Sequence, residues 1–202
     1  ILKHKGIIAN PNCSTIIMVM ALKPIYDLAK IKRVIVSTYQ AVSGAGKEGI
    51  DELDAQVRDH SEGREMTANI LPSASAEKHY PIAFNLIPQI DVFCDNLYTK
   101  EEMKMVNETK KIMEDYEMRI TATTIRVPVY RSHSESVNIE LEKEVDLGAM
   151  REALAKFPGV TVQDDPSKQE YPMPLYTSEK DDVYVGRLRR DESCEKSYNI
   201  WV

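Results

Sequence analysis

Residues 134–142 carry the pattern that most restricts the fold of this chain. Val137, Ile139 and Leu141 alternate there with the polar residues Ser136, Asn138 and Glu140. Because successive side chains of a strand point to opposite faces, one face of this strand is apolar and the other polar. Such alternation is typical of an antiparallel sheet with one face in water. The sequence therefore predicts a sheet that helices cover on one face only.

The remaining sequence mixes helical and strand patterns. Helices are expected where apolar residues recur every three or four positions, and strands where β-branched residues cluster. The expected helices are 14–29, 47–58, 100–118 and 147–157, and the expected strands are 32–40, 82–87, 120–129, 134–142, 160–163, 183–189 and 197–202. Pro24 predicts a kink or break in the first helix. One α/β domain follows, with a mixed, largely antiparallel sheet and helices on one face.

Composition excludes several classes of protein. The formal charge of −6 and the lack of a Lys/Arg-rich run argue against a nucleic-acid partner. No apolar run approaches the roughly 18 residues of a membrane-spanning helix, so a membrane partner is not expected. Three cysteines in 202 residues cannot build a disulfide framework, and they favour the reducing cytoplasm.

Both ends of the chain look like cuts in a longer sequence. It opens on the apolar run Ile1-Leu2 without an initiator methionine, and it closes on the strand-like run 198–202 without a polar tail. Natural termini are usually polar and frayed. We therefore expect a fragment of a larger protein.

Cys13 is the strongest candidate nucleophile. It lies between the turn Asn10-Pro11-Asn12 and an apolar helix, so its sulfur is expected at a helix N-terminus. The helix dipole and free amide groups there favour the thiolate and lower the thiol pKa, and the same amides could receive an oxyanion. The alternative is a small core hydrophobe, a common role for a free cysteine. Cys94 and Cys194 lack such a setting.

Gly44, Gly46 and Gly49 match the dinucleotide fingerprint G-x-G-x-x-G. That fingerprint also needs an acidic residue at the end of a second strand about 20 residues on, and no strand precedes residues 61–65. A phosphate-binding P-loop fails as well, because Ala41 stands at its first glycine. We therefore expect no classical nucleotide-binding fold in this chain.

Five further residues are candidates only in combination. Arg126 offers a fork for a carboxylate or phosphate, and His133 can carry protons near neutral pH. Taken alone, both are better explained as solvated surface residues, and Glu101 with Lys104 as an ordinary helical ion pair. Gln40 is either a polar group available for contact or simply the last residue of a strand. The other three histidines show no metal-ligand spacing, so no metal is assigned.

Four segments together resemble the aspartate-semialdehyde dehydrogenase family. They are, in the family's order, Asn10–Thr15, Tyr39–Gly46, Glu101–Lys104 and Arg126–His133. The resemblance implies that residues 1–202 form a catalytic and dimerisation domain, similar in fold to the second domain of glyceraldehyde-3-phosphate dehydrogenase. The family's nucleotide-binding domain and its terminal helix would lie outside this chain.

The resemblance also implies a reaction. Family members reduce L-aspartyl 4-phosphate to L-aspartate 4-semialdehyde with NADP as cofactor, in the biosynthesis of lysine (through diaminopimelate), threonine and methionine. Cys13 matches the nucleophile that forms a thioester. His133 matches the acid/base that takes the thiol proton and later serves the thiohemiacetal, and Gln40 the residue that positions the intermediate. The turn near the nicotinamide corresponds to Ser43, Gly44, Ala45 and Gly46.

The substrate contacts follow in the same way. Arg126 matches the residue that grips the α-carboxylate, and Glu101 the one that receives the ammonium group. Lys104 and Asn12 match the phosphate contacts. Such a set is chemically coherent, because an amino-acid phosphate needs an anion clamp at each end, an acid for its amine, a thiolate and a proton carrier.

Other functions stay open at this point. Cys13 and His133 would also serve a cysteine-dependent acyl transferase or hydrolase, and the isolated chain could be a non-catalytic dimerisation module. N-acetylglutamyl-phosphate reductase is a near rival, although Glu101 argues for a free substrate ammonium. The resemblance implies a homodimer or homotetramer, with the polar face of the sheet and the loop 59–80 as partner surfaces. We expect the isolated chain to be inactive.

Overall fold

The computed structural model describes residues 4–202, so the apolar opening Ile1–Lys3 lies outside the described residues. Its centre is a six-stranded sheet with the order β2-β1-β3-β6-β5-β4. The strands are β1 Ile31–Gln40, β2 Arg119–Arg126, β3 Ser134–Leu141, β4 Val160–Val162, β5 Val183–Arg190 and β6 Ser197–Trp201. The longer helices are α1 Cys13–Leu28, α2 Gly46–Ser61, α3 Lys100–Met113 and α4 Leu147–Lys156.

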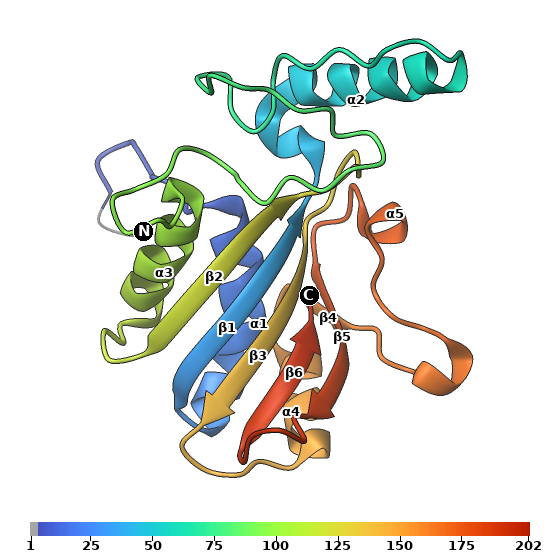
Figure 1. The fold of residues 1–202 in the computed structure, drawn as a ribbon. Coiled ribbons are helices and arrows are strands. Elements are labelled where there is room, and N and C mark those ends of the chain that lie inside the picture. Colours follow the sequence, from blue (N-terminus) through green and yellow to red (C-terminus); the bar gives the residue numbers. More distant parts are fainter. Residues whose placement is uncertain (1–3) are drawn as a thin grey trace.

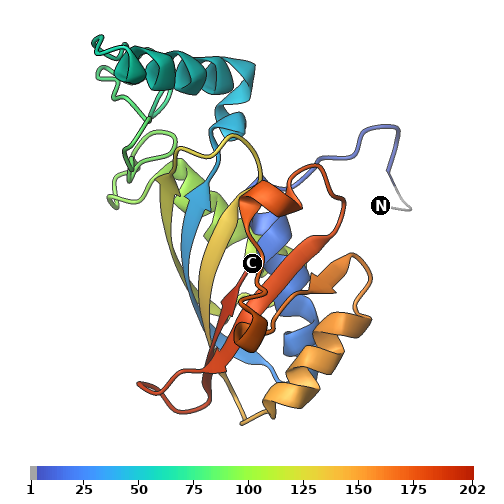
Figure 2. The same cartoon turned by 90° about the vertical axis from the view of Figure 1, so that its right-hand side faces the viewer.

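The sheet is mixed and largely antiparallel, as predicted. β1 pairs with β2, and β4 with β5, in parallel, whereas β1–β3, β3–β6 and β5–β6 are antiparallel. Helices α1, α3 and α4 lie on one face of this sheet, and no helix of residues 4–202 covers the other face of the central strands (Figures 1 and 2). The expected fold class is therefore confirmed.

The alternation in β3 produces the expected one-sided burial. Val137, Ile139 and Leu141 are at most 1% exposed, while Ser136 is exposed. The buried residues pack against the apolar side of α1, where Met18 and Leu22 are fully buried. Burial of this apolar surface fixes which face of the sheet the helices cover.

Helix α1 is continuous through Pro24, so of the predicted kink or break the break is wrong. Asn12 caps its N-terminus by accepting hydrogen bonds from the Ser14 and Thr15 N–H groups. Pro24 itself is buried in the core side of the helix. Packing along α1 compensates for the backbone hydrogen bond that a proline removes.

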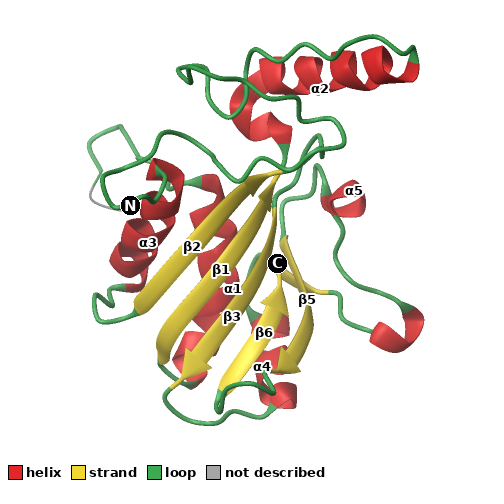
Figure 3. Cartoon of the chain, in the orientation of Figure 1, coloured by secondary structure: helices red, strands yellow, loops and turns green. Residues whose placement is uncertain are grey.

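Helix α2 stands off the end of the sheet, and a long irregular segment, 62–98, leads from it to α3 (Figures 1 and 3). The predicted strand 82–87 is wrong, because only Ile87 forms a bridge, with Arg126. Ile82 instead packs with Leu53 and Val42 in a second, small core beneath α2. The helix that follows the glycine motif thus does not cover the sheet as a dinucleotide-binding helix would.

Helix α3 begins where the sequence places it and ends earlier. Thr99 and Glu102 form a reciprocal capping box at its start. The helix ends at Met113 rather than Met118, because Glu114 adopts a left-handed conformation. The short 3₁₀ helix η2 Pro166–Lys168 and the one-turn helix α5 Pro174–Thr177 were not expected from the sequence. No helix within residues 4–202 is both long and apolar enough to span a bilayer.

Candidate active site

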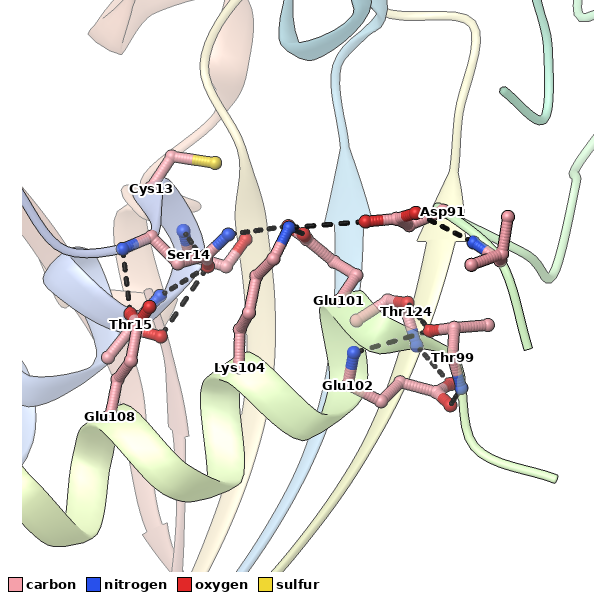
Figure 4. Close-up of polar contacts among 12 residues, drawn as sticks. Cys13, Ser14, Thr15, Asp91, Thr99, Glu101, Glu102, Lys104, Glu108 and Thr124 are labelled. Carbon is pink, nitrogen blue, oxygen red and sulfur yellow. Dashed lines mark hydrogen bonds and ion pairs between the residues drawn. The ribbon is translucent and has the colours of Figure 1, made fainter. Parts of the chain in front are cut away.

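Cys13 is the first residue of α1, as the sequence predicts. The residue is exposed, and its sulfur lies 4.0 Å from Gln40 Nε2 at the end of β1. The thiol therefore lies where the N-terminus of α1 meets the sheet (Figure 4). It is not a core hydrophobe.

The predicted lowering of the thiol pKa is wrong. Partial burial of the thiol and the Glu101 carboxylate raise the pKa of Cys13, against the opposing effect of the Ser14 and Cys13 N–H groups and of Arg126. The amides of Ser14 and Thr15 are moreover already bonded to Asn12 Oδ1, at 3.0 and 3.1 Å, so they are not free for an oxyanion. The helix terminus positions this thiol more than it activates it.

Glu101 is the centre of the polar network beside Cys13. The residue is only 6% exposed, so it is not the surface residue that helical spacing alone suggests. Its Oε1 accepts hydrogen bonds from Asn12 Nδ2 at 2.7 Å and from Gln40 Nε2 at 3.1 Å. Gln40 Nε2 also donates to Ser14 Oγ at 2.8 Å. One carboxylate therefore ties α3, β1 and the start of α1 together.

Lys104 neutralises this carboxylate. Its Nζ lies 3.3 Å from Glu101 Oε2 and 3.2 Å from Asp91 Oδ2. Although partial burial opposes the charged form, these two carboxylates raise the pKa of Lys104. The ammonium group thus stays charged at the edge of the site, held between two acids (Figure 4).

Arg126 is a buried cation without an acidic partner among the described residues. It is 4% exposed, its Nη1 donates to the Ala41 carbonyl at 2.7 Å, and its Nε has no hydrogen-bond partner. Burial lowers the pKa of Arg126, while the Glu101 carboxylate and the Cys13 thiol raise it. A buried guanidinium with an unused donor is a suitable receptor for an anion.

His133 reaches the same place from the loop after β2. Its Nδ1 accepts a hydrogen bond from the Ala41 N–H at 3.0 Å, so the neutral ring carries its proton on Nε2. Burial and, second, Arg126 lower the pKa of His133 to about 4. The ring is therefore neutral at pH 7 and presents Nε2–H as a donor.

Backbone hydrogen bonds join residues 40–42, at the end of β1, to residues 127–129, which lie between Arg126 and His133 in sequence. Val127 N–H donates to the Gln40 carbonyl at 3.0 Å, and Val42 N–H to the Val129 carbonyl at 2.8 Å. Ala41 lies between them and holds Arg126 with its carbonyl and His133 with its N–H. The structure places these residues close together: Cys13 and His133 line one hollow, and the Arg126 guanidinium lies near enough to the thiol to lower its pKa.

The glycine turn lies over these two side chains. Residues 42–45 form the 3₁₀ helix η1 (Val42–Ala45), and Gly46 opens α2 with φ of 81°. A Cβ atom on Gly44 would lie 2.6 Å from Arg126 Nη1 and 3.4 Å from His133 Cε1. A side chain at position 44 would therefore force the Arg126 guanidinium to shift. Ser43 and Ala45 lie beside it, half-buried.

Gly44→Ala is expected to reduce the catalytic efficiency of the complete protein by about 10- to 100-fold, because the methyl group displaces the Arg126 guanidinium. The backbone of Gly44 does not have positive φ, so the fold should tolerate alanine. Steady-state kinetics and the thermal unfolding midpoint would be compared. Equal kinetics for wild type and variant would contradict the assigned contact.

Glu101→Gln is expected to lower the pKa of the Cys13 thiol. The carboxylate raises this pKa, so its neutralisation stabilises the thiolate and moves the pH profile of thiol alkylation to lower pH. Iodoacetamide labelling as a function of pH measures the shift. Glu114→Gln, at an exposed position after the same helix, serves as control and should leave the profile in place. An unchanged or higher pKa of the Cys13 thiol in Glu101→Gln would contradict the electrostatic effect assigned to Glu101.

Cys13 and His133 also line one hollow of about 270 Å³. Ile16 and Trp201 form apolar parts of its wall, and Lys180 and Asp181 contribute charges. No recognisable motif marks residues 172–184, which contribute much of this wall, so it could not be expected from the sequence. The described residues contain no group of three His, Cys, Asp or Glu side chains that could hold a metal ion.

Four residues of the network were missed in the sequence. Asp91 pairs with Lys104, Ser14 accepts from Gln40, Glu108 accepts from the Asn12 N–H, and Ala41 holds both Arg126 and His133. For Glu108 a signal exists, since it lies seven residues after Glu101 and four after Lys104 on one helical face. The contacts of Ala41 go through its backbone and leave no trace in the residue type.

Comparisons with known proteins identify the family of this chain. Residues 22–202 match the family model described as semialdehyde dehydrogenase, dimerisation domain. The aspartate-semialdehyde dehydrogenase of Aquifex aeolicus is 54% identical over 200 residues, which cover 99% of this chain and 57% of that protein. The chain thus spans little more than half the length of the curated relatives it matches.

Solved structures show the same architecture. Aspartate semialdehyde dehydrogenase II of Vibrio cholerae, complexed with ASA, superposes with a TM-score of 0.88 at 44% identity, over 96% of this chain and 55% of that one. The enzyme of Candida albicans, solved with NADP, shares the fold at 21% identity and a TM-score of 0.63, over 95% of this chain and 51% of that one. The chain therefore belongs to the semialdehyde dehydrogenase family, and its relatives are aspartate-semialdehyde dehydrogenases.

Proposed function

We propose that residues 1–202 form the catalytic and dimerisation domain of an aspartate-semialdehyde dehydrogenase. The reaction is the NADP-dependent reductive dephosphorylation of L-aspartyl 4-phosphate to L-aspartate 4-semialdehyde. The observation that carries this proposal is Arg126, a buried guanidinium without an acidic partner in the described structure, beside the Cys13 thiol. The names of the relatives support it.

The two ends of the substrate have matching groups. Arg126 receives the α-carboxylate through its unused donors, and the buried Glu101 receives the ammonium group. Lys104 and the Asn12 amide face the phosphate. Because Lys104 is paired with Glu101 before substrate arrives, the incoming ammonium and phosphate replace an internal ion pair. A substrate with an acetylated amine would leave Glu101 without its cation, which disfavours N-acetylglutamyl phosphate.

Cys13 forms the covalent intermediate. The exposed thiol releases its proton to solvent, and the thiolate attacks the acyl carbon. The C–O bond to phosphate breaks, phosphate leaves, and a thioester remains on Sγ. Gln40 is held by Glu101 and Ser14 with its amide 4.0 Å from Sγ, so it orients the intermediate. His133 donates a hydrogen bond from Nε2 to the oxygen of the thiohemiacetal, since Nδ1 is occupied by Ala41. Because Nδ1 already accepts a hydrogen bond and Nε2 carries the proton, neither nitrogen is free to take the thiol proton. This favours His133 as a donor to the thiohemiacetal over His133 as a base for the thiol.

NADPH supplies the hydride that reduces the thioester when it is bound. The turn Ser43–Gly46 is the part of this chain proposed to meet the nicotinamide, and it fits a flat group because Gly44 offers bare backbone next to His133. We propose that the rest of the cofactor is held by another domain of the complete protein. The isolated chain should accordingly not turn over substrate.

We further propose a homodimer or homotetramer in the cytoplasm, in the biosynthesis of lysine, threonine and methionine. The dimerisation domain of the family and the helix-free face of the sheet support association. All three cysteines are free, which suits a reducing compartment.

The decisive assay incubates the complete protein with aspartate semialdehyde, phosphate and NADP⁺. NADPH should form only when all three are present. Hydrolysis of a thioester or acyl phosphate at a comparable rate without nicotinamide would instead support a cysteine-dependent hydrolase or transferase. NADPH formation by the isolated chain would contradict the proposed need for a second domain.

A further inference from the structure

Asn12 is the last residue before the nucleophile, and each of its polar groups is engaged. Its side-chain oxygen caps α1, its Nδ2 donates to Glu101, and its carbonyl accepts from the Ile16 N–H at 3.0 Å. Its own N–H donates to Glu108 Oε2 at 2.7 Å. The orientation of the peptide that enters Cys13 is therefore fixed by hydrogen bonds at four groups of Asn12.

The chain before Asn12 contributes little to this fixation. Residues 4–10 are exposed, and the hydrogen bond that the described structure shows within them is local, from the Gly6 N–H to His4 Nδ1. Among the described residues, the first hydrogen bonds from this segment to another element of the domain are made by Asn12. The hydrogen bond from the Asn12 N–H to Glu108 joins the end of the exposed segment to α3.

Helix α3 supplies two of the contacts from one face. Glu101, Lys104 and Glu108 lie three, four and seven positions apart, so they form a row along the helix that faces the start of α1 (Figure 4). Glu101 takes the side chain of Asn12, and Glu108 takes its backbone. A carboxylate that accepts a backbone N–H at 2.7 Å is a strong, charge-assisted bond.

We propose that Glu108 is a positioning residue for the nucleophile: its carboxylate fixes the Asn12 backbone and thereby the direction of the Cys13 side chain. Glu108 lies one turn of α3 beyond Lys104 and its carboxylate is bonded to the Asn12 N–H, so its role is exerted through Asn12. The effect of Glu108 on turnover rests on the proposed dehydrogenase function. The effect of Glu108 on the order of Asn12 does not depend on that function.

Three variants of the complete protein test the proposal. Glu108→Ala removes the acceptor, Glu108→Gln removes only the charge and keeps a side-chain oxygen for the Asn12 N–H, and Asn107→Ala changes the exposed neighbour on the same helix. Hydrogen exchange at the Asn12 amide and the steady-state constants kcat and KM are measured for each.

Glu108→Ala should accelerate exchange of the Asn12 amide by at least about tenfold, because a protecting hydrogen bond is lost. It should also lower kcat by about 10- to 100-fold with little change in KM, as misplacement of a reacting group does. Glu108→Gln and Asn107→Ala should stay near wild type in both measurements.

Other patterns overturn the proposal. A Glu108→Gln variant whose kcat falls as far as that of Glu108→Ala while its Asn12 amide exchanges as in wild type would show that the charge matters and the anchoring does not. Unchanged exchange in Glu108→Ala would show that Glu108 does not order Asn12. If the wild type lacked dehydrogenase activity, the proposed function would fail, while the exchange data would still decide whether Glu108 anchors Asn12.

Discussion

Cys13→Ser should reduce semialdehyde-dependent NADPH formation by the complete protein by about four orders of magnitude or more, as loss of a covalent nucleophile does elsewhere. Serine has the size of cysteine but forms no thioester and is far less ionised at neutral pH. The residue is exposed at the first position of α1, and Asn12 supplies the cap, so the fold should persist. Steady-state assay, circular dichroism and the unfolding midpoint provide the measurement.

Cys94→Ser and Cys194→Ser are the matched controls. Both thiols are free and neither lines the hollow with Cys13 and His133. They should retain wild-type turnover. Retention of more than about a tenth of the activity in Cys13→Ser would remove Cys13 from the role of nucleophile.

Arg126→Ala should lower kcat/KM by about 10²- to 10³-fold, mostly through a higher KM. The buried guanidinium is the proposed partner of the substrate carboxylate, and truncation of one member of a buried charge pair costs about 2–5 kcal/mol. A second effect of this substitution also lowers kcat/KM. Arg126 lowers the pKa of Cys13, so its removal raises that pKa and reduces the thiolate population at neutral pH.

Two further variants keep this prediction decisive. Arg126→Lys keeps a charge but not the fork, so it should recover part of the lost efficiency and none of the bidentate specificity. Arg131→Ala removes an exposed arginine five residues on and should behave as wild type. An unchanged KM in a folded Arg126→Ala protein would exclude Arg126 as the carboxylate receptor.

The fold was largely predictable because its signals are local. The alternation of β3 orients the sheet, β-branched residues mark β1, and the Thr99–Glu102 capping box starts α3. The errors fall where long-range packing decides. Pro24 leaves α1 continuous because the core holds the helix, and 82–87 joins a small core beneath α2 instead of the sheet.

The residues of the site were predictable from the sequence, but the direction of the Cys13 pKa shift was not. Residue types and the family resemblance named Cys13, Gln40, Glu101, Lys104, Arg126 and His133, and the structure brings them together at one end of the sheet. The direction of the thiol pKa was wrong, because burial and a carboxylate 88 residues away in sequence outweigh the local helix terminus. The tautomer of His133 likewise depends on one distant N–H group.

The sequence by itself thus determined most of the segments that become helices and strands, and that the candidate nucleophile Cys13 begins a helix, since caps and periodicity act between residues a few positions apart. Only the tertiary structure decided that Glu101 is buried, that Ala41 holds both Arg126 and His133, and that Glu108 holds the backbone before Cys13. Desolvation and hydrogen bonds between distant segments set these properties, and both depend on how the whole chain packs.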